Sequence, residues 1–392
     1  MSEALQGLLE PVTLDDFAAR WRDVRPLHIA RNQATRFADL LSTEDVERLL
    51  VERALSFPDL QLSRFVDPIA PRDYTDEADR IVPTRLLQHH ADGATIVLAR
   101  AQRHLPALGR LCSALQRQTG VRWQANAYLS PAGQQGFGPH YDSHDVFILQ
   151  VSGRKRFAFY HGGPELPLAD QRFDPVDWPA GEKMLERDID AGSTLYIPRG
   201  VMHDAVADHR KPSLHITLGC FAPTVLDVLH TALQRSAEQD VRLRRSLHGQ
   251  SLGSPAALQD LLETTLLNTT VLDAALSRLL DEVALGERAQ VTGLGRRLAE
   301  AAALDPDAGG IELRLRDGEP WQVTRDEATL HLRCTGSVLS FDGAHAEAVD
   351  RLLRARRLPV TALDMLEATQ RRVLIDGLVA QNIAELVIVP AA

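Results

Sequence analysis

Cysteine is scarce in this chain, with three residues, Cys112, Cys220 and Cys334, among 392. Three widely spaced cysteines cannot form a disulfide framework or a four-cysteine zinc site. Long hydrophobic runs are also missing, because no stretch approaches the ~18 apolar residues of a membrane-spanning helix. The first residues are acidic and lack the basic region of a secretory leader. We therefore expect a reduced, cytoplasmic protein that does not enter a membrane.

Positive charge is in deficit, since 43 lysines and arginines stand against 53 carboxylates and give a formal net charge of −10. Residues 305–392 repeat the deficit with ten arginines, no lysine and fourteen carboxylates, so that their net charge is 10 − 14 = −4. Proteins that bind DNA need clustered positive charge to displace counterions from the phosphates. The composition therefore argues against DNA as a partner.

The sequence pattern divides the chain into three regions. Residues 1–223 begin with mixed helical segments and continue, mainly over 121–221, as short strands broken by Gly and Pro, which is typical of a sandwich or small barrel. Residues 224–304 favour leucine-rich helices. Residues 305–392 alternate strand-like segments with three short helical ones, including 362–368, and suggest a winged-helix-like domain.

A candidate metal site lies in the strand-rich region. His140 and Asp142 are two residues apart, so on a strand their side chains would point to the same face. His203 follows an apolar strand and a Pro-Arg-Gly turn and could supply a second histidine. Two histidines and one carboxylate form the facial triad of non-haem Fe(II) oxygenases. The alternatives without a metal are that His140 and Asp142 form a surface His-x-Asp pair and that His203 is a turn histidine bonded to a backbone carbonyl.

Lys155 is a candidate anion-binding residue. Gly153 predicts a hairpin turn, after which Lys155 shares a strand face with Phe157 and Phe159. A lysine directed into an apolar interior requires an anionic partner. The distal carboxylate of 2-oxoglutarate would satisfy it, whereas a lysine that snorkels to the rim would need no ligand.

Four further polar residues fall on one side by strand alternation. His215 and Thr217 alternate with apolar neighbours, and Asn126 and Tyr128 share a face in the same way. Each pair could line a pocket or form a hydrogen-bonded pair within the core.

The segment NAYLSPAGQQGFGPHYDSHDVFILQVSGRKRFAFY, with LYIPRGVMHDAV and SLHITLG, closely resembles the JmjC-type ribosomal oxygenases. That resemblance implies an α+β protein with a double-stranded β-helix (cupin/JmjC) core over 1–223, a helical dimerisation region over 224–304 and a C-terminal winged-helix-like domain over 305–392. It places iron on His140, Asp142 and His203, and 2-oxoglutarate on Lys155. Asn126 and Tyr128 match polar pocket residues.

The resemblance implies an Fe(II)- and 2-oxoglutarate-dependent dioxygenase that uses O2 to hydroxylate a residue of a ribosomal protein, and that forms a homodimer. Two rivals share the chemistry, namely a tailoring hydroxylase of a peptide natural product and a demethylase. A non-enzymatic metal-binding cupin scaffold, or a zinc hydrolase or isomerase on a cupin barrel, would use the barrel differently. An inward Lys155 disfavours the scaffold, and zinc sites on cupin barrels usually carry more histidines than this strand offers.

Two residues complicate this assignment. His144 would share a strand face with Asp142 if the strand ran straight, so it is the rival for a ligand position. Gly219 stands where some members of the family carry a serine, so a hydrogen bond from that side chain is absent here.

Overall fold

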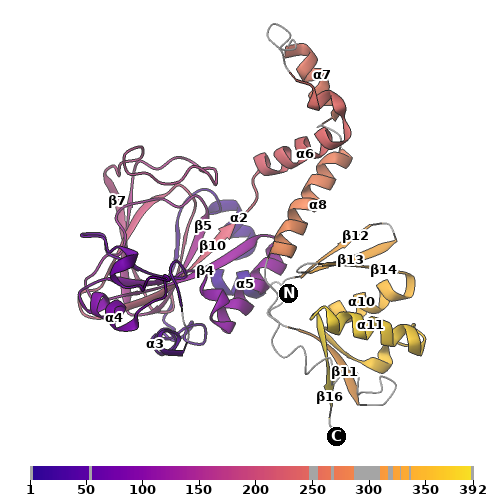
Figure 1. Ribbon diagram of the computed structural model, residues 1–392, viewed down its shortest axis with the longest axis horizontal. Helices are drawn as coiled ribbons and strands as arrows, with labels where there is room; N and C mark the ends of the chain where they lie inside the picture. Colours follow the sequence, from indigo (N-terminus) through magenta and orange to yellow (C-terminus); the bar gives the residue numbers. More distant parts are fainter. Residues whose placement is uncertain are drawn as a thin grey trace. The chain divides into compact units, whose positions relative to one another are not determined.

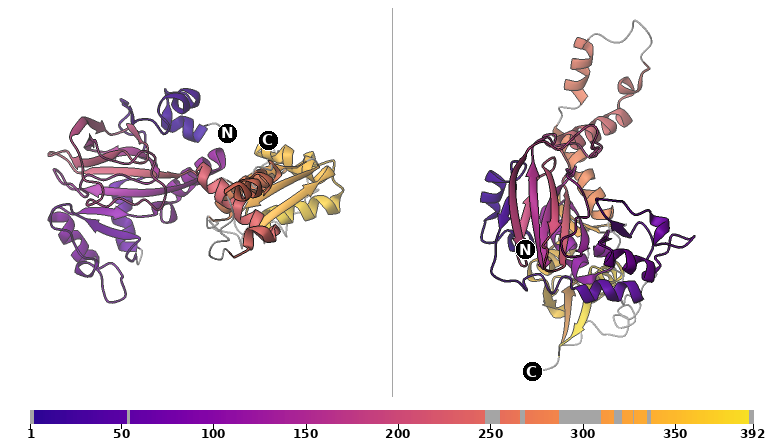
Figure 2. Two further views of the ribbon diagram at one scale, coloured as in Figure 1. Left: turned by 90° about the horizontal axis from the view of Figure 1, so that it is seen from above. Right: turned by 90° about the vertical axis from the view of Figure 1, so that its left-hand side faces the viewer.

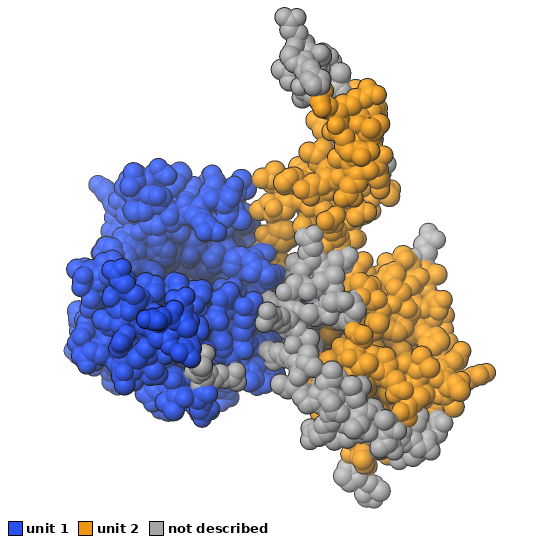
Figure 3. Space-filling view, viewed as in Figure 1, with its two compact units in different colours: residues 1–118, 122–221 blue, residues 119–121, 222–392 orange. Residues whose placement is uncertain are grey.

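The computed structural model describes residues 3–52, 55–246, 255–265, 269–286, 310–316, 321–326, 328–334 and 337–389. The chain forms two compact units, which we call unit 1 (residues 1–118 and 122–221) and unit 2 (residues 119–121 and 222–392; Figure 3). A further boundary predicted at residue 304 lies outside the described residues, so the three-part division stays a prediction.

Unit 1 is built on two antiparallel sheets (Figure 1). The larger sheet has the strand order β1-β8-β5-β10-β4-β3-β2, with β1 (Leu27–Ile29), β2 (Leu60–Ser63), β3 (Thr95–Leu98), β4 (Arg122–Ser130), β5 (Asp145–Ser152), β8 (Thr194–Ile197) and β10 (Ser213–Phe221). The smaller sheet has the order β7-β6-β9, with β6 (Arg154–Tyr160), β7 (Lys183–Asp190) and β9 (Met202–Ala207).

Strand alternation gives the larger sheet two different faces. Its inner face contributes Val146, Ile148, Leu195 and Ile197 to a small apolar core shared with Phe157, Phe159 and Ile189 of the smaller sheet. The two sheets therefore face each other across this core. This arrangement confirms the double-stranded β-helix expected from the sequence.

The outer face of the larger sheet is covered by the helices of unit 1. One continuous core joins outward residues of the sheet, such as Trp123, Phe147 and Ile216, to Leu9 and Leu108 of the helices. Figure 2 shows the indigo N-terminal helices beside the sheet. The helices are α1 (Glu3–Leu9), α2 (Leu14–Arg20), α3 (Thr43–Glu52), α4 (Pro83–Ala91) and α5 (Pro106–Thr119), with short 3-10 turns η1 (Pro71–Asp73) and η2 (Ala101–Arg103).

Gly153 does not close a hairpin, so that expectation is wrong. It takes a positive φ of 68° between β5 and β6, which belong to opposite sheets. A Cβ on Gly153 would lie 2.1 Å from the carbonyl oxygen of Pro212. Glycine therefore lets the chain cross from one sheet to the other at a point where its backbone touches a neighbouring segment. The crossing still directs Lys155 inward, as predicted.

Unit 2 contains three helices, α6 (Val225–Gln239), α7 (Pro255–Thr265) and α8 (Thr269–Gly286), within the region predicted to be helical, of which residues 287–304 lie outside the described residues. Thr224 caps α6, because its hydroxyl accepts the N–H of Asp227 while the Asp227 carboxylate accepts the N–H of Thr224. A 3-10 turn η3 (Val241–Arg244) follows α6.

The rest of unit 2 encloses its own core, formed by residues such as Leu313, Leu352 and Leu378. Its elements are β11 (Ile311–Leu315), β12 (Trp321–Arg325), β13 (Thr329–Cys334), β14 (Ser337–Asp342), α10 (Gly343–Ala355), β15 (Arg357–Pro359), η5 (Val360–Ala362), α11 (Ala368–Ala380) and β16 (Ala384–Ile388). The helix predicted over 362–368 is wrong, because residues 363–367 form an irregular turn between η5 and α11, in which Leu363 and Leu366 are buried. The winged-helix assignment stays a prediction.

Among the described residues, the structure contains no helix long and apolar enough to cross a membrane.

The crossing at Gly153 leads to a first prediction. Gly153→Ala combines a positive φ with a clash against the Pro212 carbonyl, so we expect unfolding free energy to fall by more than about 2 kcal/mol. Gly7→Ala is the control, because a Cβ there meets nothing within 4 Å. Denaturant unfolding monitored by circular dichroism measures both. Equal stability of the two variants would contradict the account of this crossing.

Candidate metal centre and its pocket

Two of the predicted ligands, His140 and His203, face each other across a short antiparallel pairing of the backbone. His203 lies near the start of β9, and His140 lies on the loop before β5. The N–H of His140 donates to the carbonyl of His203 at 2.9 Å, and the N–H of His203 donates to the carbonyl of His140 at 2.7 Å. The N–H of Gly200 donates to the carbonyl of Asp142 at 2.9 Å and extends the pairing. Backbone hydrogen bonds thus hold all three residues beside β9.

The expectation that His140 and Asp142 lie on a regular strand is wrong. Only an isolated bridge forms at His140, and β5 does not begin until Asp145. Pro139 has no N–H to donate to a ladder, which helps to explain the irregular backbone. The His144 ring does not join His140 and Asp142 in the converging group and instead stacks on Phe221 with ring centroids 4.3 Å apart.

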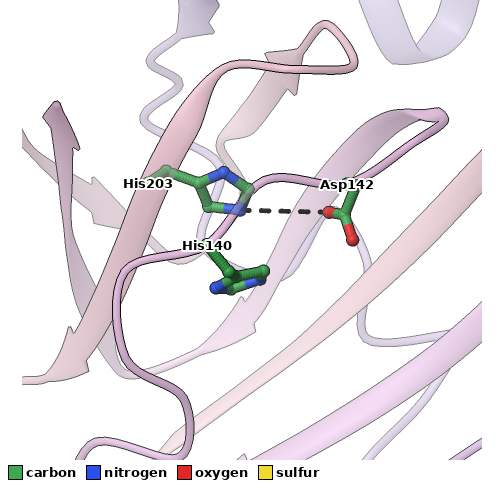
Figure 4. A group of neighbouring side chains, drawn as sticks. All are labelled: His140, Asp142 and His203. Carbon is green, nitrogen blue, oxygen red and sulfur yellow. Dashed lines mark ion pairs between the residues drawn. The ribbon is translucent and has the colours of Figure 1, made fainter. Parts of the chain in front are cut away.

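The side chains of His140, Asp142 and His203 nevertheless converge (Figure 4). One possible ligand atom from each residue lies within 4.8 Å of the others. The Nε2 atom of His203 and the Oδ2 atom of Asp142 are 4.0 Å apart. Within the described part of the chain, this is the one group of three or more such residues that could hold a metal ion.

Both histidines are fixed in the same orientation by the backbone. The Nδ1 atom of His140 lies 2.8 Å from the carbonyl of Gly138, and that of His203 lies 2.9 Å from the carbonyl of Val201. A carbonyl only accepts, so each Nδ1 carries the proton and each Nε2 keeps a lone pair. Burial and the neighbouring His140 lower the pKa of His203 well below its ordinary value, which keeps the ring neutral. Two imidazoles and one carboxylate are a donor set that fits Fe(II).

Lys155 lies inside the barrel, 4% exposed, on the inner face of β6. Its Nζ atom lies 3.4 Å from Nδ1 of His215, and within the described chain no carboxylate pairs with it. Burial lowers the pKa of Lys155 to about 7. Burial, and then the charge of Lys155, hold the pKa of His215 far below its usual range, so His215 is neutral and its Nδ1 can accept a hydrogen bond. Within the described chain, Lys155 therefore has no anionic partner. The pocket can provide one only by binding an anionic ligand.

A cavity of about 250 Å³ brings together all eight residues selected from the sequence. These residues are Asn126, Tyr128, His140, Asp142, Lys155, His203, His215 and Thr217. The β4–β10 register places Tyr128 opposite His215 and Asn126 opposite Thr217. The Tyr128 and His215 rings stack with centroids 4.7 Å apart and planes 3° from parallel. Burial, with the nearby Asp142 charge, raises the pKa of Tyr128 to about 12, so its phenol stays protonated.

Sequence reasoning missed several residues of this cavity. Thr95 comes from β3 and Phe137 from the loop before His140, and neither belongs to a periodic pattern that points inward. The conformation of Arg100 was also not foreseen. Its backbone N–H donates to Oδ1 of Asn126 at 2.9 Å and so orients the Asn126 amide. A weak signal existed for Thr95, since it is a polar residue in an otherwise apolar strand.

Comparison with known proteins agrees with this geometry. Residues 97–228 match the JmjC domain family. The chain is 31% identical over 255 residues to the bifunctional lysine-specific demethylase and histidyl-hydroxylase NO66 of Drosophila grimshawi, and 30% identical over 253 residues to the protein of that name from Dictyostelium discoideum. Each match covers 62% of this chain. The chain spans 34% of the length of the first relative and 48% of the second.

Solved structures show the same fold over almost the whole chain. An X-ray structure of Escherichia coli ycfD superposes with a TM-score of 0.58 at 17% identity, covering 96% of this chain and 98% of that chain. Another structure of that protein, called a ribosomal oxygenase, is a complex with cobalt and 2-oxoglutarate, with a TM-score of 0.57 at 17% identity.

The fold and the histidine–carboxylate site define a JmjC-domain protein. In sequence this domain is similar to the NO66 proteins and in fold to the ribosomal oxygenase ycfD, in agreement with the resemblance described above.

The converging side chains lead to a second prediction. Because Nε2 of His203 points at the shared site, His203→Ala should weaken Mn(II) binding at least about 100-fold, the loss that even outer-shell partners of a metal can cause. His140→Ala and Asp142→Ala should behave alike. His144→Ala is the matched control and should bind Mn(II) normally. Titration followed by electron paramagnetic resonance measures binding, and loss in His144→Ala with retention in His140→Ala would reverse the assignment.

Proposed function

We propose that this protein is an Fe(II)- and 2-oxoglutarate-dependent hydroxylase that acts on a side chain of a ribosomal protein. The observation that carries the proposal is one pocket that holds both a two-histidine, one-carboxylate group and the buried, anion-deficient Lys155. Iron held by His140, Asp142 and His203 would supply redox chemistry with O2 and 2-oxoglutarate that converts a C–H bond of the substrate to C–OH.

The residues of the chain have separate tasks in this reaction. Lys155 pairs with the distal carboxylate of 2-oxoglutarate, and His215 holds the lysine by accepting from its ammonium. Phe157, Val146 and Ile148 line the same cavity and exclude water around the bound cosubstrate. Tyr128, Asn126 and Thr217 supply polar contacts on the β4–β10 wall.

The pocket favours hydroxylation over demethylation of a lysine. Among the described residues that line the cavity, Asp142 is the one carboxylate, and it would bind the metal. A methylated ammonium buried there would lack a compensating anion, and burial of an uncompensated charge is costly. The NO66 relatives carry both activities in their names, and the lack of a second carboxylate among the described lining residues is our reason for proposing hydroxylation rather than demethylation.

A mass comparison of ribosomal proteins tests the function. Proteins from cells with the gene should include one that is heavier by a single oxygen atom than its counterpart from cells lacking the gene. Fragmentation then places the oxygen on one residue, and purified enzyme with Fe(II) and 2-oxoglutarate should restore it. Identical masses in the two strains would reject a ribosomal target, and would favour a peptide natural product or another protein if succinate is still released.

We also propose that the protein is a cytoplasmic homodimer that does not bind DNA. Val225, Leu226, Leu229 and Leu233 form an exposed apolar stripe on α6, with Leu226 51% exposed. An isologous dimer is the commonest way to cover such a face. In unit 2, the basic cluster of α10 is largely neutralised, since Arg351 pairs with Glu347 and Arg354 pairs with Asp350.

The exposed stripe on α6 leads to a third prediction. Sedimentation at micromolar concentration should give twice the 43.2 kDa monomer mass, and Leu229→Glu should shift the protein to monomer by placing a charge in the apolar interface. Val51→Glu, at a residue 85% exposed on α3, is the control that should remain dimeric. A wild-type protein that sediments as a monomer would end this proposal.

A fourth prediction concerns Lys155. Lys155→Ala removes the cation that pairs with 2-oxoglutarate, so the dissociation constant for 2-oxoglutarate should rise about 100-fold, as expected for the loss of one partner of a buried pair. Mn(II) affinity should stay within about twofold, because Lys155 is not a ligand. Calorimetry with Mn(II) in place of iron measures both constants. Normal 2-oxoglutarate affinity in this variant would reject the assignment.

The pH dependence of the same constant gives an independent control. The pKa of Lys155 in the free protein is about 7, so above that pH binding must return a proton to the amine. The dissociation constant should therefore rise about tenfold per pH unit above 7, with proton uptake detected in buffers of different ionisation enthalpy. Lys155→Arg keeps its charge at all these pH values and should remove this dependence, even if affinity is lower.

A further inference from the structure

His144 occupies a position that the proposed reaction does not explain. Its ring lines the cavity and stacks on Phe221 with centroids 4.3 Å apart and planes 15° from parallel. The guanidinium carbon of Arg122 lies 3.9 Å from the centroid of the same Phe221 ring. Within the described chain, no hydrogen bond is found to the ring nitrogens of His144. The ring is therefore fixed by stacking, and its nitrogens have no hydrogen-bond partner among the described residues.

Gly219 provides the space for this ring. A Cβ on Gly219 would lie 2.8 Å from Nε2 and 2.9 Å from Cδ2 of His144, closer than real Cβ contacts allow. It would also lie 3.0 Å from Cε2 of Phe221. Any side chain at position 219 would therefore displace the His144 ring. Position 219 lacks the serine side chain of some family members, and the His144 ring, which comes from a different segment, occupies that space.

The β4–β10 register locates His144 within the cavity. On the inner face, His215 lies opposite Tyr128, Thr217 opposite Asn126, and Gly219 opposite Gln124. Lys155 contacts His215 at one end of this series, and His144 contacts Gly219 at the other. The proposed 2-oxoglutarate position is thus two residue pairs away from His144. His144 is also two residues from Asp142, so its ring is close to where a reacting side chain must lie.

The polar groups at this end suit a neutral side chain. Oδ1 of Asn126 already accepts from the N–H of Arg100 at 2.9 Å and from Nε2 of Gln124 at 3.3 Å, so its NH2 group is the part left to donate. The Asn126 side chain also bonds to Tyr128. In the described lining of the cavity, the one carboxylate is the proposed metal ligand Asp142. A guanidinium or ammonium group would find no free anion here.

We propose that His144 is a substrate-recognition residue whose ring nitrogen hydrogen-bonds to a neutral polar side chain, such as imidazole, of the protein substrate. This inference rests on the proposed hydroxylase function and extends it. Gly219 and Phe221 are positioning residues that hold the His144 ring. A site built to bond a polar group discriminates strongly against groups that lack it, which makes this contact a determinant of specificity.

The experiment uses the full-length protein with Fe(II) and 2-oxoglutarate on ribosomes purified from a strain that lacks the gene. His144→Ala and His144→Phe should each lower kcat/KM for incorporation of one oxygen by about 10- to 100-fold, because one hydrogen bond and its alignment are lost. His144→Phe keeps a ring that can stack on Phe221, so its loss of activity reports the nitrogen atoms. His144→Gln keeps a donor and an acceptor and should recover part of the rate.

Gly219→Ala tests the link between the two residues. The obstructing atoms belong to the end of a side chain that can rotate, so this variant should fold while its activity drops to the level of His144→Ala. The double variant His144→Ala with Gly219→Ala should be no worse than either single variant, since the two changes remove the same contact. Gly7→Ala is the neutral glycine control. In every variant, the 2-oxoglutarate dissociation constant with Mn(II) should stay within about twofold of wild type.

The outcomes separate the two proposals. A wild type that fails to oxidise these ribosomes would overturn the proposed function and this inference with it. A wild type that works beside a fully active His144→Phe would overturn the inference alone. Multiplicative losses in the double variant would show that Gly219 does not act through His144 and would also overturn it.

Discussion

The reciprocal backbone hydrogen bonds between His140 and His203 are the constraint on which the rest of the site depends. They join a loop without regular structure to the start of β9, and the carbonyl of Asp142 extends the same pairing to Gly200. Each histidine then donates Nδ1–H to the carbonyl two residues before it, at Gly138 and Val201. Ring orientation follows from backbone geometry, so the two Nε2 atoms are aligned before any metal binds.

Lys155 affects the stability of the free protein and the affinity for the ligand in opposite directions. In the folded protein its pKa is about 7, against an ordinary value of 10.5, so between these pH values the unfolded chain binds more protons and stability rises with pH. Binding of a dicarboxylate requires the charged amine and is favoured in the opposite direction. The same buried residue therefore reduces stability in the free protein and provides affinity in the complex, and His215 moderates the conflict only as a neutral acceptor.

Residues on regular strands were the ones that the sequence could predict. Asn126, Tyr128, His215 and Thr217 face the cavity because β4 and β10 alternate without interruption over these positions. Lys155 faces inward for the same reason. This part of the fold needed only a period of two and the turn residues between strands.

The remainder depended on contacts between segments that no local pattern contains. His140 and Asp142 were placed together correctly but for the wrong reason, since a bridge to β9 rather than a strand aligns them. Gly153 signals a turn, yet its sequence does not say that the next strand joins the opposite sheet. Residues 362–368 have helical composition, but burial of Leu363 and Leu366 in a turn overrides it.

Arg100 shows how strain away from the metal supports the pocket. Its φ of 52° places a non-glycine residue in the left-handed region, at a cost of about 1–2 kcal/mol. Two interactions offset that cost, an ion pair between its guanidinium and Asp59 and the hydrogen bond from its N–H to Oδ1 of Asn126. The second decides which end of the Asn126 amide remains for other partners. The left-handed backbone of Arg100, just after β3, thus fixes the orientation of the Asn126 amide on β4. Because its oxygen accepts from Arg100, Asn126 presents its NH2 group, a donor, to the cavity.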